Sequence, residues 1–421
     1  MAAQRTGRQQ VVVVGAGFAG LQVVRHLAGT EVDVTLVDRR NYNTFQPLLY
    51  QVATAGLDEG DVAHTVRALF ADDANVDVEL GTVVGVDRDA HRVSLEDGTS
   101  LPYDALVLAA GATTNDFGVL GVADHAFPLY TLTEAIRLRH QILTCFERTE
   151  RDPALGATGA LTFVVVGGGP TGVETSGTMT ELFTKVLASG YRHADVHRAR
   201  VVLVEMGDEL LSAFRPASRR HARDTLRTRG VELRFRERVV EVTPGAVRFA
   251  SGELLATRTV VWTAGVKANP LADVLGFGLT DGGRITVEPD LSVPGDPDVF
   301  VVGDVAAPRD REGRVLPQLA PVAMQGGRHA AEQVRRRLRG EPTEPFRYHD
   351  KGTMATIGRR AAVADLRLGI SLRGSIAWIA WLGLHLIYLV GFQNRVQVLL
   401  RWAWNYLTWN WGPRLILDSD R

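Results

Sequence analysis

The stretch Gly15-Ala16-Gly17-Phe18-Ala19-Gly20 follows an apolar run from Val11 to Val14 and decides the fold of the chain. A strand that enters a glycine turn and then a helix is the pattern of a dinucleotide-binding unit. The first glycine makes a tight turn, the second lets a pyrophosphate approach the backbone, and the third lets the helix pack on the strand. Asp38 ends the next apolar run, 18 residues after Gly20, where a carboxylate can bind a ribose. The sequence therefore predicts a dinucleotide site near the N-terminus.

The same pattern occurs a second time further along the chain. Gly167-Gly168-Gly169-Pro170-Thr171-Gly172 follows the run from Phe163 to Val166, and Glu205 ends the run from Val201 to Val204. From its first glycine to a glycine that ends a later apolar run, one copy spans 96 residues (15 to 111) and the other 98 (167 to 265). Each copy also has a hairpin turn between these points, at Asp97-Gly98 and at Ser251-Gly252. Two sites in one chain imply that electrons pass between two dinucleotides.

The two sites differ in the nucleotide that they favour. The N-terminal site is predicted to bind FAD, because a later run from Val299 to Val302 ends in Gly303-Asp304, and an aspartate there can bind ribityl hydroxyls. The second site is predicted to bind NADH, because Glu205 would bind a ribose and repel a 2′-phosphate, and residues 206–214 contain no Lys or Arg. Glu205 lies 33 residues after Gly172, more than the usual spacing, and residues 189–200 are expected to be an extension of the helix and its loop.

The predicted contacts follow from these assignments. For FAD they are Gly15, Gly17, Phe18, Ala19, Gly20, Asp38, Arg39, Ala110, Gly111, Gly303 and Asp304. For NADH they are Gly167, Gly169, Thr171, Gly172, Glu205, Ala264 and Gly265.

Length and composition limit the architecture. A chain of 421 residues exceeds the size at which one core keeps growing. We predict an α/β fold with two Rossmann-like dinucleotide-binding domains and a C-terminal helical region that associates with membranes. The predicted boundaries are 8–125 and 270–345 for the split FAD domain, 126–269 for the NADH domain and 346–421 for the C-terminal region. A net charge of −1 gives no reason to expect nucleic acid as a partner.

Cys145 is the only cysteine of the chain. The chain can therefore form no internal disulfide, no cysteine-based metal site and no Cys-x-x-Cys redox pair, and no metal is predicted. This excludes the disulfide reductases, and it argues against sulfide:quinone oxidoreductases, which need more than one reactive cysteine. Cys145 lies in a predicted helix from Leu132 to Glu147, where we expect it to be a buried apolar residue.

The C-terminal segment differs from the rest of the chain. Six of the seven tryptophans lie between Trp378 and Trp411, and residues 346–421 contain ten Lys or Arg against four Asp and no Glu. The segment therefore carries a formal charge of +6, and the rest of the chain −7. A basic segment rich in tryptophan indicates contact with an anionic membrane surface.

Two helices are predicted in this segment. A helix from Asn394 to Trp411 would carry one narrow polar stripe beside Val, Leu and Trp (Asn394, Gln397, Arg401, Asn405 and Thr408). The apolar run from Ile376 to Phe392 has 17 residues, which is short for a membrane span. It would place Trp378, Trp381, His385 and Tyr388 on one face. We favour two helices in the membrane interface over one transmembrane helix or two helices buried in a dimer interface.

Several stretches together resemble the type II NADH dehydrogenases, single-subunit NADH:quinone oxidoreductases of bacterial respiratory membranes that pump no protons. The resemblance runs from about residue 10 to about residue 417 and is carried by 41–53, 167–174, 302–304, 350–355, 388–392 and 394–395. It implies a homodimer, membrane binding through C-terminal amphipathic helices, and a quinone (menaquinone or ubiquinone) as electron acceptor. It also implies a peripheral position on the cytoplasmic face of the bacterial inner membrane.

The resemblance assigns roles to individual residues. Glu174 matches a family carboxylate proposed to help deliver protons to the quinone, although a glutamate in the first turn of a helix is favoured by the helix dipole in any case. Gln325 matches the second glutamine of the family motif Ala-Gln-x-Ala-x-Gln, while Pro321 replaces the first. Lys351 would contact the flavin, and Gln46 and Pro47 would form part of its pocket. His385 is interpreted as an interfacial histidine rather than a proton donor.

Two other functions stay open at the level of sequence. One is an NAD(P)H-dependent reductase of a protein carrier such as ferredoxin, which would be soluble and carry a charged docking patch. The other is a membrane-bound flavoprotein that senses NADH, because binding motifs do not report turnover.

Overall fold

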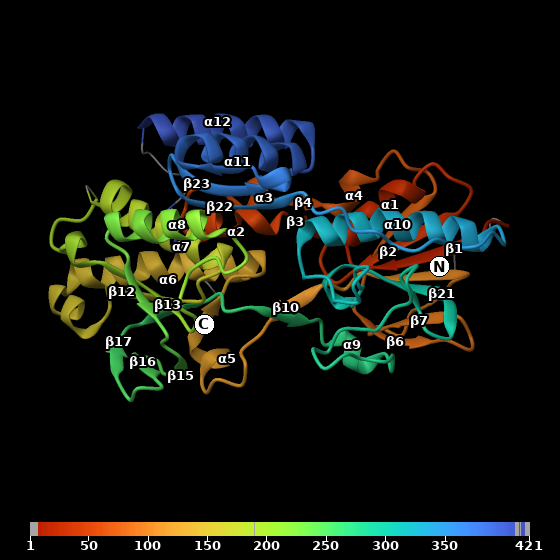
Figure 1. The fold of residues 1–421 in the computed structure, drawn as a ribbon, viewed down its shortest axis with the longest axis horizontal. Helices are drawn as coiled ribbons and strands as arrows, with labels where there is room; N and C mark the ends of the chain where they lie inside the picture. Colours follow the sequence, from red (N-terminus) through yellow and green to blue (C-terminus); the bar gives the residue numbers. More distant parts are fainter. Residues whose placement is uncertain (1–6, 189, 409–411, 413, 417–421) are drawn as a thin grey trace. The chain divides into compact units, whose positions relative to one another are not determined.

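The structure is a computed structural model that describes residues 7–188, 190–408, 412 and 414–416. The described chain forms two compact units. The first unit comprises residues up to 43 together with 64–113 and 266–350, and the second comprises 44–63, 114–265 and the residues after 350. Figure 1 shows the elements of each unit.

The first unit is built on a six-stranded sheet in the order β20-β21-β9-β1-β2-β5, in which only the pair β20–β21 is antiparallel. Its strands are Ser292–Val293, Asp296–Val301, Ala105–Leu108, Gln10–Val14, Asp33–Asp38 and Val76–Leu80. β1 is a run of valines because helices or strands cover both faces of this sheet. Helices α1 (Phe18–Leu27) and α10 (Ala320–Leu338) cover one face. The three-stranded sheet β6-β7-β8 (Val83–Asp87, Arg92–Leu95 and Ser100–Pro102) covers the other.

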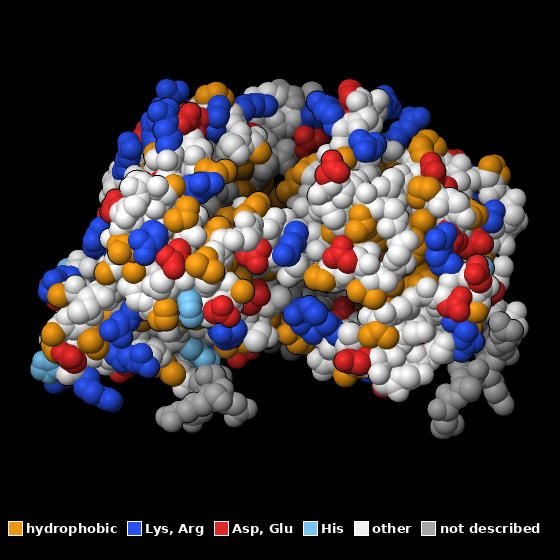
Figure 2. Space-filling view, turned by 90° about the horizontal axis from the view of Figure 1, so that it is seen from below, with side chains coloured by type: hydrophobic (Ala, Val, Ile, Leu, Met, Phe, Trp, Pro, Cys, Tyr) orange, Lys and Arg blue, Asp and Glu red, His pale blue; other side chains and the backbone are white. Residues whose placement is uncertain are grey.

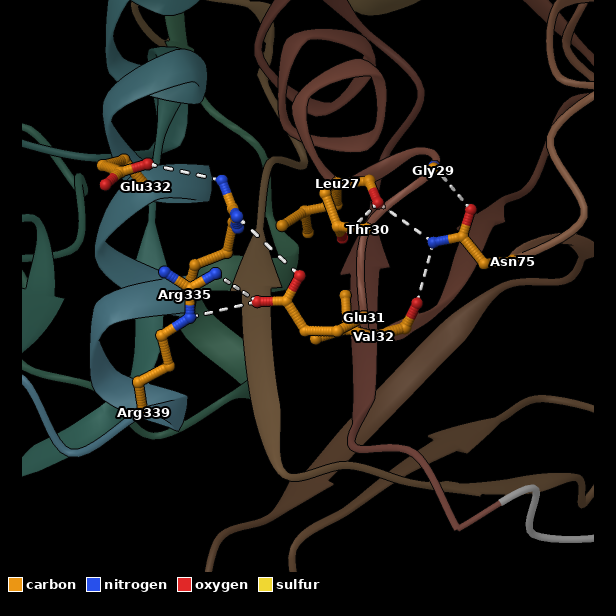
Figure 3. A network of polar contacts seen from close by, with 9 residues as sticks. All are labelled: Leu27, Gly29, Thr30, Glu31, Val32, Asn75, Glu332, Arg335 and Arg339. Carbon is orange, nitrogen blue, oxygen red and sulfur yellow. Dashed lines mark hydrogen bonds and ion pairs between the residues drawn. The ribbon is translucent and has the colours of Figure 1, made fainter.

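A polar network holds the end of α10 to the connection between α1 and β2 (Figure 3). The carboxylate of Glu31 pairs with Arg335 and Arg339, with N–O distances of 3.7 Å and 2.5 Å. Asn75 donates hydrogen bonds to the carbonyls of Leu27 and Val32, at 3.0 Å and 2.7 Å. The ion pairs are exposed and contribute little, whereas the Asn75 bonds are buried and fix the turn.

The second unit is built on a parallel five-stranded sheet in the order β11-β18-β12-β13-β14. Its strands are Ala126–Pro128, Thr259–Trp262, Thr162–Val166, Arg200–Glu205 and Glu232–Phe235. Helices α6 (Leu132–Arg151), α7 (Pro170–Glu181) and α8 (Pro216–Thr228) belong to this unit. A three-stranded antiparallel sheet, β15-β16-β17 (Val239–Val242, Ala246–Phe249 and Leu254–Ala256), packs on one face of the parallel sheet. The two units thus repeat one plan, as the two glycine stretches predict.

Other predictions about local structure are confirmed. Cys145 lies in α6 and is buried, and the turns at Asp97-Gly98 and Ser251-Gly252 join antiparallel strands. The helix continues beyond α7 as a π-helical turn, Leu182–Leu187, and the described part of the predicted extension before β13, residues 190–199, is a loop that contains a 3₁₀ turn, Val196–Arg198. The long spacing between Gly172 and Glu205 is therefore due to a longer helix and a longer loop.

The C-terminal residues pack with the second unit. The antiparallel sheet β22-β23-β24 (Gly352–Gly358, Ala361–Leu366 and Ser371–Arg373) precedes helices α11 (Gly374–Tyr388) and α12 (Phe392–Thr408). β22 contacts α7, and α11 lies on β23, where Ala362, Ala364 and Ala377 form a small core. The predicted boundaries treat residues 346–421 as a separate region and place residues 44–63 in the FAD domain. In the structure residues 346–350 belong to the first unit, whereas residues 44–63 and the described residues after 350 pack with the second unit. There α12 binds the segment around α3 (Glu59–Val62).

The polar stripe of α12 faces the protein. The side-chain amides of Asn394 and Asn405 donate to the carbonyls of Asp61 and Gly56, at 2.9 Å and 2.8 Å. Arg401 pairs with Asp58 and with Asp61. Only Gln397 and Thr408 of the predicted stripe are exposed, and residues 409–411 lie outside the described residues. The helix thus satisfies carbonyls and carboxylates of the second unit with its polar side chains, and it leaves apolar side chains such as Leu400 and Leu407 on the surface, while Val398 and Trp402 are buried.

Both helices expose large apolar side chains. The exposed fractions are 69% for Ile376, 63% for Ile379 and 66% for Ile387 on α11, and 64% for Leu400 and 82% for Leu407 on α12. We call these residues, together with Leu399 and Trp404, the apolar face. On the surface that Figure 2 shows, viewed from below, hydrophobic side chains alternate with basic and acidic ones. In the part of the chain that the structure describes, every helix is too short or too polar to cross a membrane.

Arg401 gives a first testable prediction about this docking. We expect Arg401→Gln to lower the free energy of unfolding by about 1–3 kcal/mol, because it leaves the buried carboxylate of Asp61 without its cation. Thermal unfolding at neutral pH measures the change. Arg314→Gln, which removes an exposed pair with Asp310, is the control and should change the midpoint by less than a quarter as much. Equal effects of the two substitutions would contradict the conclusion that the polar stripe of α12 faces the protein.

Candidate active site

The predicted FAD residues of the first unit gather at one edge of its sheet. Strands β1, β9 and β21 run parallel, so their carboxyl ends lie together, and they are followed by Gly15, Ala110-Gly111 and Gly303-Asp304. Asp38 ends the neighbouring β2, and the exposed Arg39 follows it. Ligands of open parallel sheets bind beyond the carboxyl ends of the strands. The positions of these residues in the fold are therefore consistent with the predicted FAD site.

The glycine turns of both units have the geometry that a dinucleotide requires. Gly15 and Gly167 have φ values of +102° and +111°, which favour glycine. A Cβ at Gly20 or Gly172 would lie 1.8 Å or 1.9 Å from the carbonyl oxygen of the first glycine in its turn. A Cβ at Gly17 or Gly169 would meet nothing within 4 Å. The first and third glycines are thus needed for the turn itself, while the second leaves open space at the start of α1 or α7. Because no side chain caps either helix, backbone N–H groups there can bind a pyrophosphate.

The acidic residues at the two sheet edges are held in the same way. A carboxylate oxygen of Asp38 accepts a hydrogen bond from the N–H of Ala16 at 2.7 Å, and the other accepts one from Arg40 at 2.8 Å. Glu205 accepts from the N–H groups of Gly168 and Gly207, at 2.6 Å and 2.7 Å. Each carboxylate therefore lies beside its glycine turn, where a ribose bound next to a pyrophosphate would be. Thr171, Ala264 and Gly265 lie at the same edge of the second sheet.

Sequence reasoning missed several residues around these edges. Asn269 donates to the carbonyl of Ala110 at 3.1 Å, and Gln318 donates to that of Asp304 at 3.0 Å, so both support the first site. In the second site Arg236, at the end of β14, pairs with Asp208. No glycine pattern marks these positions, because each comes from a loop that the fold alone brings to the edge.

The second glycine of each turn gives a matched pair of substitutions. Both residues have extended backbones with negative φ, so valine causes no backbone strain there. We expect Gly17→Val to yield folded protein that has lost its flavin, because the side chain fills the space for the pyrophosphate. We expect Gly169→Val to keep its flavin and to raise KM for NADH by at least about 10- to 200-fold, the effect of a misfit of one methylene group, because valine adds three carbon atoms. Flavin absorbance per protein and steady-state kinetics measure the two effects. Loss of flavin in Gly169→Val would contradict the assignment.

Glu174 lies in α7 and is buried, with 7% of its surface exposed. Sequence reasoning placed it in the first turn of the helix, but α7 begins at Pro170, so Glu174 is in the second turn and the dipole argument is wrong. Its carboxylate accepts a hydrogen bond of 3.1 Å from the N–H of Thr356 in β22. Burial raises the pKa of Glu174 to about 8. At neutral pH this carboxyl therefore holds a proton that it can donate, and it can recover one near its own pKa.

Aromatic side chains of α11 face inward above Glu174. Trp381 is 1% exposed and stacks on His385, with 3.8 Å between the ring centroids. Nδ1 of His385 lies 2.8 Å from the carbonyl of Trp381, and burial lowers the pKa of His385 to about 4. His385 is neutral at pH 7 and holds no additional proton. Its interpretation as an interfacial histidine stays a prediction.

The other predicted residues have identified neighbours within their own units. Gln325 of α10 binds both the N–H and the carbonyl of His349, each at 3.0 Å, so its amide fixes the segment before Lys351. Pro321 lies in the first turn of α10, as predicted. In the second unit Lys351 donates to the hydroxyl of Tyr388 at 3.3 Å, and Gln46 and Pro47 form a 3₁₀ turn before α2 (Leu49–Ala53). Contacts of Lys351, Gln46 and Pro47 with a flavin stay predictions.

Comparison with known proteins agrees with this architecture. Residues 9–327 match the family model described as pyridine nucleotide-disulphide oxidoreductase, and residues 350–408 match the NDH2 C-terminal domain. The chain is 38% identical to the type II NADH:quinone oxidoreductase Ndh of Mycobacterium tuberculosis, over 99% of this chain and 92% of that protein. It is 33% identical to a type II NADH:quinone oxidoreductase of Staphylococcus aureus, over 85% of this chain and 89% of that protein. The solved structure of NDH2 from Plasmodium falciparum with NADH has the same fold, with a TM-score of 0.88 at 18% identity, over 97% of this chain and all of that one.

The fold and the two nucleotide edges define a flavoprotein of the pyridine nucleotide-disulphide oxidoreductase class. Within this class, the chain belongs to the type II NADH:quinone oxidoreductases. The predictions of the fold class, the family and the cofactors FAD and NADH are thereby confirmed.

Proposed function

We propose that the protein is a respiratory enzyme that passes two electrons from NADH through FAD to a quinone in the membrane and pumps no protons. The observation that carries this proposal is the position of Glu174, a buried carboxyl that is protonated at neutral pH, below helices whose outer side is the apolar face. Quinone reduction consumes protons as well as electrons, so it needs such a group next to a surface that a lipid-soluble substrate can reach.

Different residues of the chain bind the two cofactors, supply the proton and bind the membrane. Bound FAD would accept a hydride from NADH and pass two electrons to the quinone. The glycine turns and Asp38 hold FAD at the edge of the first sheet, and the second turn with Glu205 holds NADH. Glu174 supplies a proton to the quinone. The apolar face binds the lipid surface, and its exposed isoleucine and leucine side chains would leave water on binding.

The proposed setting follows from the same features. The protein would be a homodimer bound peripherally to the cytoplasmic face of the inner membrane, with menaquinone or ubiquinone as acceptor. The basic charge of residues 346–421 supports attraction to anionic lipids.

Anaerobic stopped-flow absorbance tests the proposal. The flavin of the detergent-purified protein is first reduced with NADH, and the product is then mixed with a menaquinone or ubiquinone analogue, or with ferredoxin as control acceptor. We expect reoxidation by a quinone to exceed any rate with ferredoxin. Rapid reduction without reoxidation by quinone would overturn the proposal and leave the reductase of a protein carrier or the NADH sensor.

A further inference from the structure

Phe117 has an exposed side chain on a strained backbone. It lies in the loop between β10 (Ala112–Thr114) and α5 (Val122–His125), and 61% of its surface is exposed. Its φ is +51°, in the left-handed region that a bulky side chain rarely adopts. The other apolar residues with positive φ in the described part of the chain are at most 2% exposed (Ala55, Leu211 and Leu291). Their packing compensates for the strain, whereas the ring of Phe117 has little packing in the protein to do so.

Hydrogen bonds to the end of β18 hold this conformation. The side-chain oxygen of Asn115 accepts a hydrogen bond of 2.9 Å from the N–H of Phe117. The N–H of Asn115 donates to the carbonyl of Gly265 at 3.0 Å, and its carbonyl accepts from the indole N–H of Trp262 at 2.8 Å. Trp262 is the last residue of β18 and is 3% exposed. The loop is therefore fixed to the carboxyl end of β18, and a strained residue that its surroundings fix in this way is typical of ligand-binding sites.

The ring of Phe117 lies beside Gly265, a predicted NADH residue. A Cβ on Gly265 would be 3.4 Å from Cζ and 3.6 Å from Cε2 of the ring. One edge of the ring therefore packs at the end of β18, while the rest of the ring is open to solvent. The exposed ring thus borders the segment that is predicted to bind NADH.

The topology of the second sheet determines which half of NADH would reach Phe117. The chain passes from β12 to β13 and β14 on one side of β12, and then returns to β18 on the other side. A dinucleotide binds across such a point of reversal, with its pyrophosphate at the glycine turn after the first strand. Glu205 ends β13, so the adenosine ribose would lie on that side of the turn. The nicotinamide half would then lie on the β18 side, next to Phe117.

An exposed phenyl ring suits the nicotinamide half. The nicotinamide of NADH is a planar ring without charge, and aromatic rings pack on one another in offset or edge-to-face arrangements. The exposed surface of Phe117 would leave water on binding, which favours the complex. A hydride leaves the nicotinamide from one face of its ring, so the protein must hold the ring at a fixed angle. A phenyl ring on a loop that hydrogen bonds fix can do this.

We propose that Phe117 packs on the nicotinamide half of NADH and orients it for hydride transfer. The strain at Phe117 is then offset when the nicotinamide covers the ring. The inference rests on the proposed function, in which the second glycine turn and Glu205 hold NADH. It adds no step to the reaction, because the hydride still moves from NADH to the flavin and neither a proton nor an electron passes through Phe117.

Phe117→Gly tests the proposal, because glycine adopts positive φ without strain and the variant should fold. Calorimetry on the oxidised, flavin-loaded protein measures binding of two probes: NAD⁺, which contains the nicotinamide, and ADP, which does not. We expect Phe117→Gly to bind NAD⁺ at least about tenfold more weakly and ADP within about twofold of wild type. In stopped flow, it should slow flavin reduction by saturating NADH by about 10- to 100-fold, because a displacement of about 1 Å can cost about 10²-fold. Reoxidation by quinone should keep its rate.

Two variants serve as controls. Leu120→Ala shortens another side chain of the same loop, which is 68% exposed and lies at a residue that pairs with β15, so this variant should bind NAD⁺ like wild type. Phe117→Leu keeps an apolar side chain but has no planar ring, so its affinity for NAD⁺ should lie between those of Phe117→Gly and wild type.

The outcomes separate the parts of the proposal. Wild-type affinity for NAD⁺ in Phe117→Gly would overturn the packing on nicotinamide, and a wild-type rate of flavin reduction would overturn the orienting role. Equal weakening of NAD⁺ and ADP would place Phe117 at the adenosine half instead. If Phe117→Gly does not fold, the same outcomes in Phe117→Leu decide. Gly169→Val tests the underlying site: if it binds NAD⁺ and ADP like wild type, the proposed NADH site itself is wrong.

Discussion

Replacement of Glu174 by glutamine should slow reoxidation of the flavin by quinone by about 10²- to 10⁴-fold, the usual contribution of a general acid. Glutamine keeps the volume of the side chain and can still accept the hydrogen bond from Thr356, but it has no proton to give. Reduction by NADH should keep its rate, because a hydride transfer needs no proton from this carboxyl. Stopped-flow measurement of the two half-reactions separates the effects. Equal slowing of both half-reactions would indicate a structural defect.

The pKa of Glu174 also predicts how stability depends on pH. Burial raises it from the ordinary 4.5 to about 8, so between these values the folded chain binds one proton more than the unfolded chain. Stability from this group is fully present below about pH 4.5 and is lost as the pH rises through about 8. The Glu174→Gln variant lacks this loss. Its thermal midpoint, measured relative to wild type, should therefore rise between pH 5 and pH 9, and a constant difference would contradict the raised pKa.

Two charges on the apolar face should release the protein from membranes. Leu400 and Leu407 of α12 are 64% and 82% exposed. Burying one leucine contributes about 1.5–3 kcal/mol, so replacing both by glutamate should weaken binding to vesicles by at least about 10²- to 10⁴-fold. Sedimentation with vesicles that contain anionic lipid measures the partition, and NADH should still reduce the flavin at the wild-type rate.

A matched control tests whether the position of the charge matters. Leu254 of β17 is 56% exposed in the same unit but lies outside the apolar face, so Leu254→Glu should bind vesicles like wild type. Unchanged vesicle binding of the Leu400→Glu/Leu407→Glu variant would show that the face does not touch lipid. If that variant instead changed from dimer to monomer, measured by light scattering, the face would be a dimer interface.

The sequence predicts those parts of the molecule whose structure depends on residues that are close together in the chain. A glycine turn between a buried strand and a helix leaves few alternatives, so the sequence alone places the residues from Gly15 to Gly20 and from Gly167 to Gly172 at sheet edges. Glu205 is predictable for the same reason, because it ends β13, which pairs with β12, the strand that precedes the second glycine turn.

The remaining features depend on long-range packing. Periodicity predicts that α12 has a polar and an apolar side, but it does not tell which side meets the protein, and carbonyls and carboxylates from residues 56–61 decide this. The pairing of Glu181 with Arg229 joins residues that are 48 positions apart, and the hydrogen bond between Thr356 and Glu174 joins residues that are 182 positions apart. No side chain caps the start of α7, so the sequence does not mark the residue at which this helix begins. For this reason the sequence does not show that Glu174 lies in the second turn of α7 and not in the first.

The hydrogen bonds of Asp38 and Glu205 to their own glycine turns have a consequence for affinity. A free glutamate loses up to about 1.5–2 kcal/mol of conformational entropy when its side chain is fixed. Here the backbone N–H groups of Ala16 and Gly168 fix the two carboxylates in the folded chain. The entropy is therefore lost when the protein folds and not when a nucleotide arrives. NADH, which must bind and leave in every turnover, meets a rigid acceptor that imposes no ordering cost on each cycle.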